Sequence, residues 1–172
     1  MSPKSRSYFT IIEILVVIAV IAILMGAVVG IFEYVSRRNG DARTQAVVEM
    51  LRSGLEQYKE KYGFYPPSIE YKKFHLDKLT AKGVSDNFNQ FIDYNHFTQS
   101  GKSEQKDGLF YVLDGFGGYI YYRCPGYVNK TAYDLGSFGA DGKVGDGVSD
   151  SPTQANFQSH FGKGDDVTNC RR

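Results

Sequence analysis

Five aspartates lie in the Gly-rich part of the 172-residue chain that follows Phe138. They are Asp141, Asp146, Asp150, Asp165 and Asp166. Calcium takes about six to eight hard oxygen ligands from carboxylates, carbonyls and water, and glycine lets the backbone bring such ligands together. An EF-hand is excluded, because Lys143 and Gly145 stand third and fifth from Asp141, where that loop needs oxygen side chains. Composition alone is compatible with a calcium site and with a solvated acidic loop.

A single carboxylate, Glu13, interrupts the apolar run from Ile11 to Ile31. At about 1.5 Å per residue, a helix of this length spans roughly 30 Å, which is the thickness of the hydrocarbon core of a bilayer. A carboxylate inside that core costs about 2.5 to 3.5 kcal/mol even on a lenient insertion scale. Glu13 is therefore expected either to reach toward an interface or to have a cationic partner.

The other polar residues show no catalytic arrangement. The three histidines have no metal-ligand spacing and are His75, His96 and His160. The stretch Gly115–Gly118 lacks the third glycine and the following helix of a dinucleotide-binding loop, and no serine lies in a nucleophile elbow. The net charge of +1 provides no field that would hold nucleic acid. The sequence predicts a protein that is not an enzyme and binds no nucleic acid.

The apolar run is expected to cross a membrane once. A secretory signal peptide is disfavoured, because its apolar region spans only about 7 to 15 residues. The segment Met1–Tyr8 carries Lys4 and Arg6 and no acid, so the positive-inside rule places the N-terminus in the cytoplasm and the rest outside. Arg37 and Arg38 at the far end oppose this orientation without reversing it.

Beyond the membrane the helical pattern continues. Apolar residues recur at three- and four-residue steps and form one stripe, which comprises Ala42, Ala46, Val47, Met50, Leu51, Leu55, Tyr58 and Tyr62. Charged side chains fill the other faces, and no proline occurs between Pro3 and Pro66. We expect one helix from near Phe9 to Lys61, followed by Gly63 as a C-cap.

The remaining sequence predicts a small antiparallel sheet. Residues 68–108 are expected to form a connecting region with at most a short helix near Phe74–Leu79. Leu109–Leu113 and Tyr119–Cys124 have strand composition and flank a Gly-rich turn, which predicts a hairpin. Tyr133–Phe138 is expected to add a third strand, and Gly139–Gly164 lacks periodicity and is expected to be loop.

Several segments of the sequence resemble those of a known protein family. Phe9-Thr10-Ile11-Ile12-Glu13 and the apolar run after it resemble the N-terminal processing and methylation motif of the type IV pilin and pseudopilin superfamily. Five later segments resemble the major pseudopilins of type II secretion systems and are Leu55–Lys59, Tyr62–Pro66, Asp114–Gly117, Tyr133–Leu135 and Ser137–Gly142. The resemblance implies an α+β, type IV pilin-like fold, in which a long N-terminal helix packs on a small antiparallel sheet with a long C-terminal metal-binding loop.

For the N-terminus, the resemblance implies cleavage by prepilin peptidase between Tyr8 and Phe9, methylation of the new amine and assembly into a helical filament. The cationic amine of a neighbouring subunit is then a partner for Glu13. The family nearly always has glycine where this chain has Tyr8. A tyrosine side chain obstructs close approach of the backbone, so either the cognate peptidase tolerates Tyr8 or this subunit is cut poorly.

For the C-terminal loop, the resemblance implies calcium bound by carboxylates and backbone carbonyls. Asp141 matches the first ligand of the family pattern, Asp165 and Asp166 match the later acidic cluster, and the Phe138 carbonyl is the expected fourth ligand. This alignment implies an insertion of roughly Val148–Phe161. If the insertion lies elsewhere, Asp146 and Asp150 take the later role.

Cys124 and Cys170 are the only cysteines. The pilin-like fold places both outside the membrane in an oxidising compartment, which makes a disulfide possible. In the chain-entropy model such a bridge stabilises by about 4 kcal/mol. Two free thiols are the alternative.

The resemblance organises the chain into a leader peptide (1–8), a transmembrane and assembly helix (9–36) and a periplasmic globular domain (37–172). It implies a subunit of a type II secretion pseudopilus that is anchored once in the inner membrane and drives protein export across the outer membrane. The implied partners are further copies in the filament, prepilin peptidase, minor pseudopilins and the inner-membrane assembly platform. The alternatives are a type IV pilus or DNA-uptake pilin, and an anchored periplasmic binding module that never polymerises.

Overall fold

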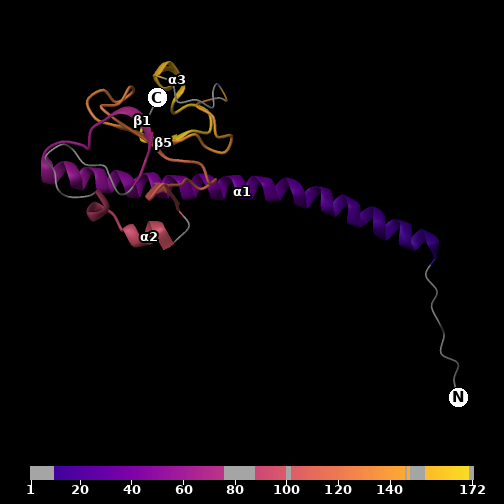
Figure 1. The fold of residues 1–172 in the computed structure, drawn as a ribbon. Coiled ribbons are helices and arrows are strands. Elements are labelled where there is room, and N and C mark those ends of the chain that lie inside the picture. The colour runs from indigo at the N-terminus through magenta and orange to yellow at the C-terminus, as the bar shows by residue number, and fades with distance from the viewer. Residues whose placement is uncertain (1–9, 76–87, 100–101, 146, 148–153, 171–172) are drawn as a thin grey trace. The chain divides into compact units, whose positions relative to one another are not determined.

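The computed structural model describes residues 10–75, 88–99, 102–145, 147 and 154–170. Contacts divide the chain into two compact units, Met1–Arg38 and Asn39–Arg172. Helix α1 (Ile11–Tyr62, 52 residues) supplies the first unit and the first element of the second (Figure 1). The expectation of one continuous helix is therefore confirmed.

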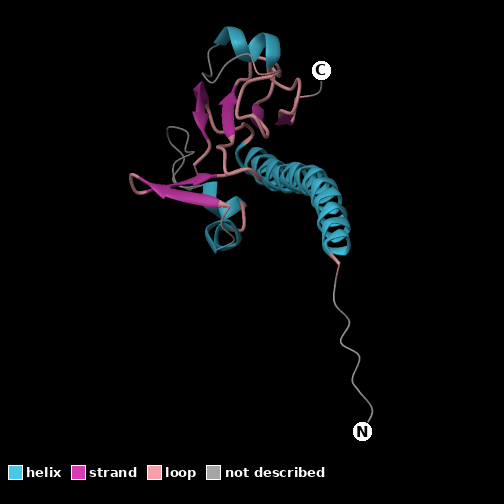
Figure 2. Cartoon of the chain, turned by 90° about the vertical axis from the view of Figure 1, so that its right-hand side faces the viewer, coloured by secondary structure: helices cyan, strands magenta, loops and turns pink. Residues whose placement is uncertain are grey.

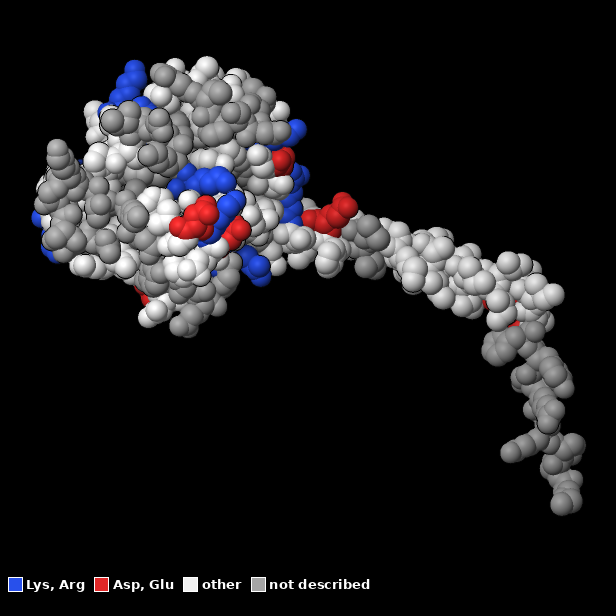
Figure 3. All heavy atoms as spheres, in the orientation of Figure 1, with Lys and Arg blue, Asp and Glu red and all other residues white. Residues whose placement is uncertain are grey.

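The first part of α1 is apolar on all sides. Where the structure describes them, its large hydrophobic side chains from Ile11 to Val35 are exposed, and Figure 3 shows few charged atoms along this stretch. By length and composition α1 is able to cross a membrane. The helix ends at Gly63, whose φ of 81° and N–H bond to the Lys59 carbonyl (2.7 Å) form the predicted glycine C-cap.

The second part of α1 carries the core of the globular unit. One stripe of the predicted apolar positions is at most 1% exposed and consists of Val47, Leu51, Leu55 and Tyr58. These side chains pack with residues of the sheet, including Tyr122 and Leu135. The four- and three-residue spacing that predicted the helix therefore also identified its buried face.

The main sheet has four strands in the order β1 (Ser68–Lys73), β4 (Tyr121–Cys124), β5 (Asp134–Ser137) and β6 (Val167–Thr168). All neighbours are antiparallel, and Tyr122 pairs with Leu135. In both views the sheet lies between the C-terminal half of α1 and α3 (Gln154–His160) (Figures 1 and 2). The α+β fold with a long helix on small antiparallel sheets is thus confirmed, with more strands than expected.

The expected hairpin is confirmed only next to its turn. There Leu113 bridges to Tyr119, and the Ile120 N–H donates to the Val112 carbonyl at 3.1 Å. Strand β3 (Leu109–Val112) pairs in full with β2 (Ser103–Lys106), which was not expected. The turn between β2 and β3 is Asp107-Gly108, with φ of 52° and 74°. Asp-Gly is a preferred dipeptide for a two-residue hairpin turn, so a local signal for this pairing was present in the sequence.

Residues 68–108 contain more structure than a connecting region. They hold β1, the 3-10 helix η1 (Phe88–Phe91), α2 (Tyr94–Gln99) and β2. The short helix expected near Phe74–Leu79 is wrong at its start, since Phe74 is buried beside β1 and His75 bridges to Tyr111; residues 76–79 lie outside the described residues. Phe74 bonds through its N–H to the Ile120 carbonyl, so sheet pairing prevails over local helical preference.

The segment Gly139–Gly164 is not loop throughout, because α3 lies within it. Phe157 and Phe161 are fully buried and form a second core with Phe138, Val144 and Cys170. Tyr121 of β4 packs against this core, while its neighbour Tyr122 points into the first. Alternation along β4 therefore gives each face of the sheet its own core.

We expect Leu51→Ala to lower the free energy of unfolding by about 2 to 5 kcal/mol, because it removes a fully buried side chain from the first core. Denaturant unfolding of the detergent-solubilised full chain, followed by circular dichroism, measures the change. Gln45→Ala, at an exposed position of the same helix, is the control and should change stability by less than about 0.5 kcal/mol. Equal effects of the two substitutions would contradict the assigned core face.

Candidate functional site

The N-terminus of α1 is capped by a capping box. Thr10 donates its N–H and its hydroxyl to Glu13 Oε2 at 2.7 and 2.8 Å, and the Glu13 N–H donates to Thr10 Oγ1 at 3.3 Å. These bonds satisfy polar groups at the first turn of the helix. Sequence analysis missed this role of Thr10, although Thr-x-x-Glu before an apolar run is its known signature.

In the single chain the Glu13 carboxylate thus has an intramolecular partner. Tyr8 and Phe9, the predicted cleavage and methylation positions, lie outside the described residues. The pairing of Glu13 with the amine of a neighbouring subunit stays a prediction.

The turn between β3 and β4 joins the sheet to α1 through Asp114. This buried carboxylate accepts the N–H groups of Phe116 (2.8 Å) and Gly118 (2.7 Å), and it accepts the hydroxyl of Ser137 on β5. The Gly115 N–H donates to Thr44 Oγ1 on α1 at 2.9 Å. The Asp114–Gly117 segment that carried the family resemblance is therefore a structural connection between helix, turn and sheet.

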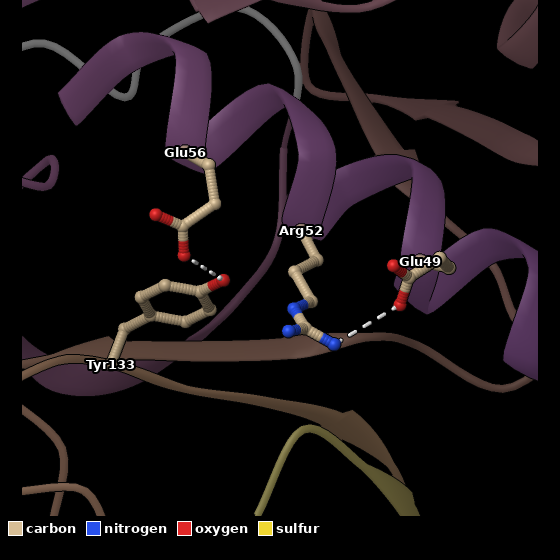
Figure 4. A network of polar contacts seen from close by, with 4 residues as sticks. All are labelled: Glu49, Arg52, Glu56 and Tyr133. Carbon is tan, nitrogen blue, oxygen red and sulfur yellow. Dashed lines mark hydrogen bonds and ion pairs between the residues drawn. The ribbon is translucent and has the colours of Figure 1, made fainter. Parts of the chain in front are cut away.

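Tyr133, the residue directly before β5, also reaches α1. The Tyr133 hydroxyl donates to Glu56 Oε1 at 3.5 Å, and Arg52 donates to Glu49 at 3.4 Å on the same side of the helix (Figure 4). The Arg52–Glu49 pair is largely exposed, so it contributes little stability. The Tyr133–Glu56 bond therefore joins α1 to the segment before β5, whereas the Arg52–Glu49 pair lies within α1.

Asp165 holds the start of the C-terminal loop. Its Oδ2 accepts the N–H groups of Ala140 and Asp141 at 2.8 and 3.0 Å. Asp141 in turn accepts the Lys143 N–H at 2.7 Å and forms an Asx turn. A Cβ on Gly139, whose φ is 71°, would overlap the Asp165 backbone, so glycine is needed for this close approach.

Asp166 lies deeper in the same loop junction. Its Oδ2 accepts the N–H groups of Gly145 (3.0 Å) and Gly162 (2.9 Å), while its buried Oδ1 has no hydrogen-bond partner among the described residues. Burial raises the pKa of Asp166 to about 7; the two N–H groups oppose this, and the carboxylates of Asp165 and Asp141 add to it. The structure therefore brings three of the predicted ligand residues close enough to interact.

The Oδ1 atom of Asp166 is the observation that fits a calcium ion. It is a buried carboxylate oxygen that accepts no hydrogen bond from the described residues, and two further carboxylates lie near it, so hard oxygen ligands of the kind that calcium prefers are present. Among the described residues, no group of three His, Cys, Asp or Glu side chains is already arranged around a metal position. Phe138 directly precedes the Gly139 turn, and the alternates Asp146 and Asp150 lie outside the described residues.

The predicted disulfide is not formed. Cys124 and Cys170 are free thiols. Strand β5 lies between β4, which ends at Cys124, and β6, which precedes Cys170, so two strand spacings of about 4.8 Å separate them, whereas a disulfide needs Cα atoms within about 7 Å.

The two thiols also have different surroundings. Cys124 packs against the first core and Cys170 lies in the second. Cys170 donates to Asp134 Oδ1 at 3.3 Å, and Cys124 donates to the Ala132 carbonyl at 3.5 Å. Burial raises the pKa of the Cys124 thiol, which disfavours the reactive thiolate.

Asp134 is a second buried carboxylate, and it lies in the Tyr133–Leu135 segment of the family resemblance, where the sequence predicted no role for it. It is fully buried and accepts the N–H groups of Tyr127, Val128 and Asn129 at 2.7 to 2.9 Å. It fixes the turn between β4 and β5. No pattern in the local sequence distinguishes this aspartate from exposed ones.

Comparison with known proteins gives one informative match. The chain is similar to the type II secretion system core protein G of Pseudomonas aeruginosa, with 30% identity over 155 residues. The matched region covers 88% of this chain and 95% of the relative. No family model matches the sequence, and no solved structure matches it.

The raised pKa of Asp166 predicts a pH dependence of stability in the absence of calcium. Between about pH 4 and pH 7 the folded chain retains the Asp166 proton while the unfolded chain has lost it. The folded state therefore binds more protons, and this group lowers the free energy of unfolding as the pH rises through that window. Asp166→Asn remains neutral and should lose this part of the slope.

Urea unfolding of the full chain in detergent and EDTA at pH 5, 6, 7 and 8 measures the effect. Asp107→Asn is the matched control, because Asp107 is exposed in a turn with a positive φ that asparagine tolerates. If the free energy of unfolding of Asp166→Asn depends on pH as steeply as that of the wild type, Asp166 is not the cause of this dependence.

Proposed function

Because the chain belongs to the family of the type II secretion system core protein G, the major pseudopilins, we propose that it polymerises into a pseudopilus that drives protein export across the outer membrane. The similarity along nearly the whole length of both chains is the observation that carries this proposal. Since that relative is a structural subunit, the chain is proposed to act by assembly, without catalysis.

The exposed apolar half of α1 supports assembly through this helix. Where the structure describes them, its large side chains from Ile11 to Val35 are 46 to 83% exposed, and so large an apolar area is unfavourable in water. A bilayer covers them before assembly, and the same segments of neighbouring copies cover them in a filament. The second unit is folded around its own two cores.

This function implies a location and a set of partners. We propose a single-pass inner-membrane protein whose C-terminal unit lies in the periplasm and which enters the pseudopilus on assembly. Its partners are prepilin peptidase, further copies of the chain, minor pseudopilins and the inner-membrane assembly platform. Cleavage between Tyr8 and Phe9, methylation of Phe9 and a role for Glu13 in assembly belong to the same proposal.

Co-expression with the cognate peptidase and secretion machinery tests processing and assembly together. We expect intact mass and N-terminal sequencing to show a mature chain that begins at methylated Phe9, and electron microscopy to show filaments. Tyr8→Gly should accelerate cleavage, because glycine lets the backbone approach the peptidase more closely. A chain that retains residues 1–8 in both forms would contradict the proposal and favour an anchored binding module.

In the same assay, Glu13→Ala should remain in the membrane and lose filaments at least tenfold, because the buried amine of a neighbour loses its partner. Glu33→Ala is the control, since Glu33 is an exposed carboxylate on the same helix. Normal filaments from Glu13→Ala would exclude Glu13 from assembly.

We also propose that the loop binds calcium through Asp141, Asp165, Asp166 and the Phe138 carbonyl. The partnerless Asp166 Oδ1 supports this assignment. A bound calcium ion supplies positive charge that offsets repulsion among the three carboxylates. The residues themselves already hold the loop ends together through the four N–H bonds to Asp165 and Asp166.

Calcium should raise the melting temperature of the full chain, because a ligand at about 1,000 times its Kd contributes about 4 kcal/mol. Asp166→Asn should lose most of this shift, and Asp107→Asn should keep it. The measurement is thermal unfolding in detergent with EDTA or excess calcium, with magnesium as an ion control. No calcium shift in the wild type would contradict the proposed site.

A further inference from the structure

Helix α3 and the residue that directly follows it each contribute one aromatic side chain to the second core. Phe157 and Phe161 are four residues apart, are fully buried and have ring centroids 4.7 Å from each other. Both rings pack on Phe138, at 5.6 and 6.4 Å, and Phe138 stacks on Tyr121 of β4 at 4.3 Å. A helix of seven residues is not stable alone, so this core holds α3 in place.

The aromatic core lies at both ends of the acidic loop. Phe138 directly precedes the Gly139 turn, and Phe161 directly precedes Gly162, whose N–H donates to Asp166. The second N–H on that carboxylate comes from Gly145, which follows the buried Val144 of the same core. The two glycines that donate to Asp166 therefore each follow directly after a buried residue of the second core.

The end of α3 also touches the turn directly. A Cβ on Gly145 would lie 2.8 Å from the Cβ and the carbonyl oxygen of His160, the last residue of α3. The Gly145 backbone is thus in close contact with the final turn of the helix. If α3 were displaced, the Gly162 N–H would move away from Asp166, because Gly162 lies just after the helix. The Gly145 backbone would also lose the surface against which it packs.

We propose that Phe157 and Phe161 are positioning residues for the acidic loop. They hold Asp165 and Asp166 against the Gly139–Gly145 turn before any cation arrives. The part of this inference that concerns calcium affinity rests on the proposed calcium function. The aromatic core then holds the carboxylates in place, so the free energy of calcium binding is not reduced by the entropy cost of ordering the loop.

The test uses the full chain in detergent, with Phe161→Ala, the conservative Phe161→Leu and the control Phe88→Ala. Phe88 is as fully buried as Phe161 but lies in the first core. Hydrogen exchange in EDTA reports on the loop amides, and calorimetric titration with calcium reports the Kd.

In Phe161→Ala, we expect the amides of Ala140, Asp141, Gly145 and Gly162 to exchange at least tenfold faster, while β4 and β5 stay protected. The Kd for calcium should rise at least tenfold. Phe161→Leu should recover most of both effects, because it refills most of the core. Phe88→Ala should lower the melting temperature without changing the loop exchange or the Kd.

Three results would overturn the inference. Protected loop amides in Phe161→Ala would show that the aromatic core does not hold the loop. An unchanged Kd with a loosened loop would show that calcium itself gathers the carboxylates. If Phe161→Ala loosens β4 and β5 as well, Phe157→Leu is the milder variant, and uniform loosening there too would reduce the role to general stability.

A wild type that binds no calcium would instead refute the calcium proposal. The exchange measurement in EDTA would still decide whether α3 holds the loop, so the two failures are distinguishable.

Discussion

The packing of one stripe of α1 against β4 and β5 is the interaction on which the rest of the globular unit depends. Leu51, Leu55 and Tyr58 exclude water from the face of the sheet that carries Tyr122 and Leu135. Only when this face is covered can the opposite face of the same strands support a second core. The Asp114 turn then fixes the relation of helix and sheet through Thr44 on α1 and Ser137 on β5.

Three buried or half-buried aspartates show two different uses of a carboxylate. Asp114 and Asp134 have donors on both oxygens, supplied by backbone N–H groups, a hydroxyl and a thiol, so they stabilise turns. Asp166 has donors on one oxygen only, and burial with nearby negative charge raises its pKa to about 7. Incomplete satisfaction of a buried charge is costly and often marks a place where a ligand binds. This difference is the physical basis for assigning a cation to the C-terminal loop.

The two parts of α1 have different surfaces. Where the structure describes them, the large hydrophobic side chains from Ile11 to Val35 are exposed, while residues after Asn39 bury an amphipathic stripe. The globular unit therefore folds around its own part of α1. The proposed assembly surface and the proposed calcium site draw on different parts of the sequence.

The sequence by itself determined the elements whose signals are local. Short stretches of sequence encode the apolar run from Ile11 to Ile31, the stripe through Leu55 and the Gly63 cap. Together these signals define α1. Strand β5 was also predicted from strand composition over Tyr133–Phe138. The closeness of Asp141 to Asp165 and Asp166 was anticipated only with help from the family resemblance.

Only the tertiary structure decided the pairing of β1 with β4, the presence of α3 and the separation of Cys124 from Cys170 by β5. Strand pairing joins distant residues, and a short helix such as α3 is stable only against a core that distant residues provide. The partnerless oxygen of Asp166 likewise arises from burial, which no local pattern encodes.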